Sequence, residues 1–130
     1  MGGKKRHLLV VDDDTLSSRI VEQTLRARGY AVTTASDRNA ALYILANRTV
    51  DMVVADPSAP NCDGLALVRA IKDTRRSMPV VILSDDPAMA ESVNQWDNLA
   101  VQCKPEDLHD HAALVLGAVT SMLPVARPAC

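Results

Sequence analysis

The chain has 130 residues, of which 48% are hydrophobic and 23% charged, and this length and composition are typical of one globular domain. Its 14 lysines and arginines against 16 acidic residues give a net charge of -2, and the basic cluster at Lys4 to Arg6 is short, so we expect no direct binding to nucleic acid. Asp12 interrupts the N-terminal apolar run before it reaches the length of a secretion signal, and no apolar run could span a membrane. We therefore expect a cytoplasmic protein without membrane attachment.

The cysteine and histidine patterns do not predict a metal site. Cys62, Cys103 and Cys130 have spacings that match neither zinc nor dithiol motifs, and their odd number fits a reducing compartment. We interpret them as small packing residues or exposed thiols. On a helix, His109 and His111 would point about 200° apart, which excludes a shared metal. We expect both to be solvated helix residues.

Five short aliphatic segments alternate with segments of helical periodicity. The predicted strands are Leu8 to Val11, Ala31 to Thr34, Met52 to Ala55, Val80 to Leu83 and Leu99 to Cys103. Runs such as "VVIL" lack polar alternation, which is typical of parallel strands that helices cover on both faces. We therefore predict an α/β fold: a doubly wound, five-stranded parallel sheet with five helices. One domain should occupy residues 5–123, followed by an unstructured tail at 124–130.

The first and last helices have the clearest sequence signals. The first should pack an apolar face of Leu16, Ile20, Val21 and Leu25 and end at Gly29, and Asp14 is expected to cap its N-terminus. The last should run from Leu108 to Met122, before Pro124 stops it.

Polar residues follow four of the five predicted strands. Asp12 and Asp13 come after the first strand, Asp56 after the third, Ser84 after the fourth and Lys104 after the fifth. Ligands of doubly wound sheets bind outside the carboxyl ends of the strands, so these side chains are predicted to share one site.

These motifs resemble those of response-regulator receiver domains of the two-component signalling family. "LLVVDDD" is similar to the family's acidic-pair motif, and "DMVVADPSAPNCDG" to its acceptor motif, with Pro60 in the loop and the turn at Asp63 and Gly64. "PVVILS" and "CKP" supply the hydroxyl of Ser84 and the lysine Lys104 that precedes Pro105. The resemblance covers about Lys5 to Leu116 and implies a flavodoxin-like strand order of 2-1-3-4-5.

The resemblance also implies a chemistry. Asp56 would accept a phosphoryl group, assisted by Ser84 and Lys104, and Mg²⁺ would be held by Asp13, Asp56 and the Ser58 carbonyl, with Asp12 acting through water. Such a protein assists its own phosphorylation and dephosphorylation and is not a turnover enzyme. The implied partners are a sensor histidine kinase or phosphotransfer protein, and a downstream protein that contacts the face made by the fourth helix, fifth strand and fifth helix.

Two alternatives stay open at this stage. Haloacid-dehalogenase phosphatases share an aspartyl nucleophile after the first strand, but Leu16 stands where their motif carries Thr or Val.

The second alternative is a pseudo-receiver that binds partners with little or no switching. It is favoured by Asp85 after Ser84, by Val101 in place of the usual aromatic, and by Pro57 and Ala59 near the acceptor. The segment from Ser84 to Lys104 is also short by about two residues against the family pattern. This shortening predicts a short or irregular fourth helix, and Trp96 in the same segment is expected to be a packing residue.

Overall fold

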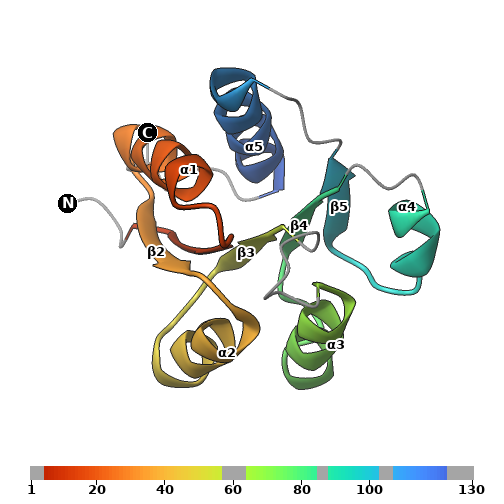
Figure 1. The fold of residues 1–130 in the computed structure, drawn as a ribbon. Coiled ribbons are helices and arrows are strands. Elements are labelled where there is room, and N and C mark those ends of the chain that lie inside the picture. The colour runs from red at the N-terminus through yellow and green to blue at the C-terminus, as the bar shows by residue number, and fades with distance from the viewer. Residues whose placement is uncertain (1–4, 57–63, 85–87, 103–106, 123–130) are drawn as a thin grey trace, which may run out of the picture.

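The sheet is parallel and five-stranded, in the order β2-β1-β3-β4-β5 (Figure 1). The computed structural model describes residues 5–56, 64–84, 88–102 and 107–122. The strands are β1 (His7–Val11), β2 (Ala31–Ala35), β3 (Met52–Ala55), β4 (Val80–Leu83) and β5 (Leu99–Gln102). The predicted fold class and strand order are confirmed.

Helices cover both faces of the sheet. They are α1 (Thr15–Ala27), α2 (Arg38–Asn47), α3 (Gly64–Thr74), α4 (Met89–Ser92) and α5 (Leu108–Met122). Figure 1 shows α1 and α5 on one face and α2 and α3 on the other. Helix α4 is a single turn, as the shortened segment before the fifth strand predicted, and Trp96 packs against the core on the α2 and α3 side. Within the described ranges, none of the helices combines the length and hydropathy needed to cross a membrane.

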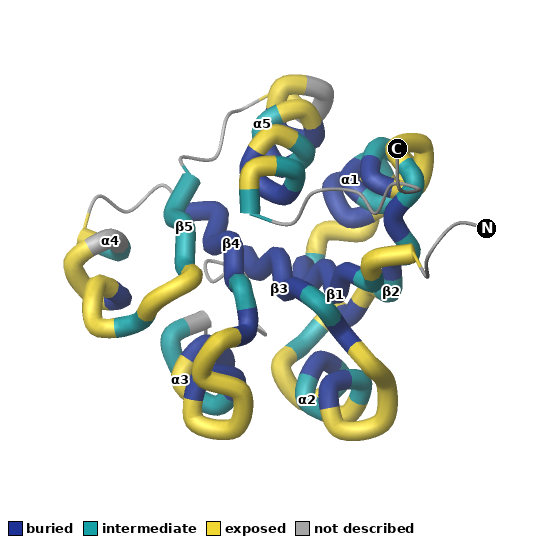
Figure 2. The backbone as a smooth tube through the Cα atoms, turned by 180° about the vertical axis from the view of Figure 1, so that it is seen from behind, coloured by how far each residue is buried: buried dark blue, intermediate teal, exposed yellow. Residues whose placement is uncertain are grey.

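Strand β1 joins the two halves of the core. Leu8 and Val10 pack under α1 and α5, whereas Leu9 and Val11 pack under α2 and α3. Figure 2 shows the central strands as the most deeply buried part of the chain. Burying an aliphatic side chain of this size contributes about 1.5–3 kcal/mol, so an unbroken apolar strand is what a sheet covered on both faces requires.

Both ends of α1 follow the predicted capping pattern, but its buried face differs from the predicted one. The Asp14 carboxylate accepts hydrogen bonds from the Leu16 and Ser17 amides, and Gly29 has a φ of 97° just after the C-cap. The left-handed conformation at this position favours glycine. Leu16, predicted to be in the core, is 59% exposed. The buried face consists of Ser17, Ser18, Val21 and Leu25, because the first turn of the helix turns Leu16 outward.

His111 also corrects a prediction. It is buried on α5 rather than solvated, because it lies one turn before Val115 on the face that packs inward. The side chain of His109, the three cysteines and the predicted tail at 124–130 lie outside what the structure describes.

Lys72, near the end of α3, is buried with its ammonium group on three backbone carbonyls. Nζ donates to Asp97 O at 2.6 Å, Met78 O at 2.7 Å and Arg76 O at 3.3 Å. Burial lowers the pKa of Lys72 below 10.5, while the Asp97 carboxylate opposes this shift. These hydrogen bonds join the loop before β4 to the turn before β5.

We expect Lys72→Met to destabilise the fold by about 2–4 kcal/mol, because the apolar side chain leaves the buried Met78 carbonyl and two part-buried carbonyls without their donor. Urea unfolding followed by circular dichroism measures this change. Lys5→Met, at an exposed position, is the control and should shift stability by less than about 0.5 kcal/mol. Equal stability of the two variants would contradict a structural role for the buried ammonium.

Candidate functional site

The last hydrogen bonds of the parallel ladders align three polar residues at one edge of the sheet. The Asp12 amide donates to Ala35 O and the Asp56 amide to Val11 O, both at 3.0 Å, and the Ser84 amide donates to Gln102 O at 2.9 Å. Val11 pairs with Ala55 in the register, so Asp12 and Asp56 follow neighbouring strands at the same level. Ser84 follows β4, the next strand across. Asp12, Asp56 and Ser84 therefore lie at one edge of the sheet, each directly after one of three neighbouring strands.

These side chains are buried although two of them are carboxylates. Asp56 is 3% exposed, Asp12 5% and Ser84 6%, whereas Asp13 is half-buried. Carboxylates are costly to bury unless hydrogen bonds or cations compensate them. Two adjacent buried carboxylates are therefore suited to a cation.

The aspartates after β1 have separate tasks. Asp12 Oδ1 accepts a hydrogen bond from the Asp14 amide at 2.9 Å. Asp14 Oδ1 in turn accepts from the Leu16 amide at 3.0 Å and the Ser17 amide at 3.1 Å. One turn thus holds the Asp12 carboxylate and starts α1, which fixes the helix relative to the strand end.

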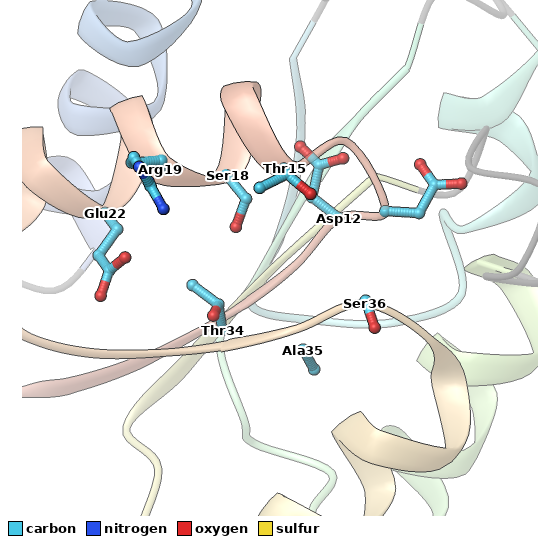
Figure 3. Close-up of a pocket in the computed structure, with 9 residues that line it drawn as sticks. Asp12, Thr15, Ser18, Arg19, Glu22, Thr34, Ala35 and Ser36 are labelled. Carbon is cyan, nitrogen blue, oxygen red and sulfur yellow. The ribbon is translucent and has the colours of Figure 1, made fainter.

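A cavity of about 180 Å³ opens beside Asp12 and Asp13, between α1 and the end of β2. Figure 3 shows Asp12 and Thr15 at one end of this cavity and Arg19 and Glu22 at the other. The remaining polar lining consists of the hydroxyl groups of Ser18, Thr34 and Ser36. This polar, open space gives water and hydrated ions access to the acidic pair.

Sequence reasoning missed these hydroxyl residues. The signal was present, because Thr15 and Ser18 are three residues apart and therefore share a helix face next to Asp12. Thr34 and Ser36 flank the end of β2, which meets the same edge of the sheet as Asp12.

Of the predicted metal ligands, the structure describes Asp12, Asp13 and Asp56. The described residues hold no group of three Asp, Glu, His or Cys side chains arranged to bind a metal ion. Asp12, Asp13 and Asp56 thus do not form a complete ligand set by themselves. Their oxygen chemistry fits a hard cation that completes its shell with a carbonyl and water. The predicted ligand Ser58 and the predicted phosphate-binding Lys104 lie outside the described residues, as do Asp85, Pro57 and Ala59.

Comparison with known proteins settles the family. The sequence pattern of the response regulator receiver domain matches residues 8–113. The chain belongs to the response-regulator receiver family. It is 33% identical over 113 residues to the DNA-binding transcriptional regulator NtrC of Salmonella typhimurium, covering 85% of this chain but 24% of NtrC. Response regulator MprA of a Mycobacterium species is 35% identical over 90 residues, covering 69% of this chain and 39% of MprA. This receiver therefore spans well under half the length of these relatives.

Solved structures agree on the fold. The chemotaxis response regulator CheY4 of Vibrio cholerae superposes with a TM-score of 0.79 at 22% identity, covering 92% of this chain and 100% of CheY4. TrrA of Thermotoga maritima, solved in complex with Mg²⁺ and BeF, gives a TM-score of 0.74 at 21% identity, covering 91% of this chain and 99% of TrrA. The family match leaves no support for the haloacid-dehalogenase alternative.

Proposed function

We propose that this receiver domain accepts a phosphoryl group on Asp56 and signals through contacts with other proteins. The observation that carries the proposal is the alignment of Asp12, Asp56 and Ser84 by the last hydrogen bonds of three neighbouring strands. Asp56 lies between the strand ends that carry a second carboxylate, Asp12, and a hydroxyl, Ser84, and this arrangement suits a residue that accepts a phosphoryl group. The proposed donor is a sensor histidine kinase or a phosphotransfer protein.

The proposed reaction is a transfer to the Asp56 carboxylate. One Asp56 oxygen attacks phosphorus, the bond between phosphorus and the donor's leaving atom breaks, and an acyl phosphate forms on Asp56. The Ser84 hydroxyl donates a hydrogen bond to one phosphoryl oxygen, and Lys104 supplies a positive charge to another. When bound, Mg²⁺ neutralises charge on the phosphoryl oxygens, and Asp12, Asp13, Asp56 and the Ser58 carbonyl are the proposed residues that hold it. The domain assists this step and the later hydrolysis, in which water releases inorganic phosphate and restores the Asp56 carboxylate, without acting as a turnover enzyme.

The proposed partner surface is the face formed by α4, β5 and α5. All four residues of β5 are half-buried, and none is charged. An uncharged edge favours contact with another protein over contact with the phosphate backbone of nucleic acid. The DNA binding named for NtrC belongs to that longer protein. A cytoplasmic location is proposed to match the kinase or phosphotransfer partner.

Phosphorylation of Asp56 is tested with acetyl phosphate and Mg²⁺. We expect intact-mass measurement to show one added phosphoryl group that hydroxylamine removes, because acyl phosphates react with this nucleophile. Asp56→Asn should abolish the addition, whereas Asp73→Asn, at an exposed position on α3, should retain it. An unmodified wild-type protein would refute the acceptor role.

Metal binding is tested by thermal unfolding without phosphate. Mg²⁺ should raise the melting temperature, with a stabilisation that follows RT ln(1 + [L]/Kd), because it relieves repulsion among the carboxylates. Asp13→Ala should remove most of this rise, and Asp73→Ala should leave it unchanged. The same response to Mg²⁺ in wild type and Asp13→Ala would show that Asp13 is not a ligand.

Val101 generates a prediction about switching. It lies opposite Ile82 in the register, is half-buried, and has a single χ angle with no ring to expose or bury. We expect beryllofluoride with Mg²⁺ to shift the amide NMR signals of β5, α4 and α5 weakly, and partner affinity to change less than tenfold (~1.4 kcal/mol). Large shifts with a greater change in affinity would show that another residue performs the role of the aromatic.

A further inference from the structure

A second polar cavity lies at the other end of the sheet, away from Asp12, Asp13 and Asp56. Strand β2 is one of the two outer strands of the sheet and lies between α1 and α2 (Figure 1). Next to the beginning of β2 is a cavity of about 370 Å³, which we call the β2 basic cavity; its polar lining consists of Lys5, His7, Arg26, Tyr30, Thr33 and Arg48. None of these residues takes part in the proposed phosphoryl transfer.

The fold gathers positive charge around this cavity from distant parts of the sequence. Lys5 precedes β1, Arg26 lies in the last turn of α1, and Arg48 follows α2. Burial raises the pKa of Tyr30 above 10.0, while the positive charges of Arg28 and Arg6 oppose this shift. Three of the 14 lysines and arginines therefore line the cavity, and two carboxylates lie beside it: Glu22 pairs with Arg26, and Asp51 accepts a hydrogen bond from the His7 amide.

Hydrogen bonds hold the two cavity arginines over the open edge of β2. Arg26 Nη2 donates to Val32 O at 2.8 Å and also pairs with Glu22 at 3.0 Å. Arg48 Nη1 donates to Thr33 Oγ1 at 3.2 Å. A guanidinium group has five N–H donors, so each arginine keeps donors beyond these contacts. The arginines are thus oriented before any ligand arrives.

His7 and the strand backbone complete the arrangement. His7 Nδ1 donates to the Thr49 carbonyl at 2.6 Å, and His7 Nε2 lies 2.7 Å from Thr33 Oγ1, which fixes the ring against β2. The Ala31 amide donates to Arg6 O on the β1 side, so the alternation of a parallel ladder turns the Val32 amide toward the open edge. A backbone N–H group therefore joins the cationic groups at this edge.

We propose that the β2 basic cavity binds a small anion that carries more than one phosphate group, a polyphosphate or a nucleoside polyphosphate. Arginine, lysine and backbone N–H groups are the donors that recognise phosphate oxygens, and several cations around one cavity match several negative charges. The cavity volume is in the range of small-molecule sites. The cations converge on a hollow instead of spreading over a flat surface, which favours a small ligand over duplex DNA or a membrane.

The test is a titration of the ¹⁵N-labelled protein with tripolyphosphate, without divalent cations. We expect saturable shifts of the amide signals of His7 and of Ala31 to Thr33, and binding that weakens as salt is raised. Lys5→Gln/Arg48→Gln should weaken binding at least about tenfold. Arg38→Gln/Arg69→Gln removes the same charge at exposed positions elsewhere and should change affinity less than about twofold.

Thermal unfolding checks that both double variants fold, and acetyl phosphate labelling checks that their Asp56 site is intact. Charge-conserving Arg48→Lys, which should retain measurable binding, separates loss of charge from loss of structure. The proposal is overturned if the wild type shows no saturable shifts, if the shifts lie near Asp56 instead of β2, or if both double variants lose affinity equally. Binding to anionic vesicles or duplex DNA without binding to tripolyphosphate would also overturn it.

Discussion

The alignment of strand ends by parallel ladders is the constraint on which the rest of the structure depends. Strands β1, β3 and β4 each contribute a polar group where the apolar run stops, and the final amide-to-carbonyl bonds set these groups at one level. A slip of one residue in β1 against β3 would move Asp12 away from Asp56 and exchange the two faces of β1. The same apolar residues that hold the core therefore also position the buried carboxylates.

The fold could be predicted from the sequence because the sequence signals of its strands are clear. Continuous aliphatic runs arise where helices cover both faces, and charged residues directly after them mark where burial ends. Asp12, Asp56 and Ser84 could be placed for this reason alone. The Asp14 cap and the Gly29 turn were also predictable, since each depends on local backbone geometry.

The wrong predictions concern which turns of a helix are covered by the rest of the protein. Helical periodicity assigned Leu16 to the buried face and gave no reason to bury His111, because the pattern defines a face without showing what covers each turn. Lys72 had no sequence signal at all. A lysine at a helix end is normally solvated, and its acceptor at Asp97 lies 25 residues away along the chain. The β2 basic cavity was invisible for the same reason, since its cations come from three separate elements.

The hydrogen bonds of Lys72 restrict substitutions at position 72 more than at the positions of its acceptors. Its acceptors are main-chain carbonyls, which every amino acid provides. Positions 76, 78 and 97 are thus free to change identity without losing this contact, provided that their backbone keeps its path. Position 72 has no such freedom, because only a long side chain with a terminal donor reaches all three oxygens. Among homologues, the hydrogen bonds should therefore constrain the identity of position 72, whereas position 97 matters only through the charge that its carboxylate places near the ammonium group.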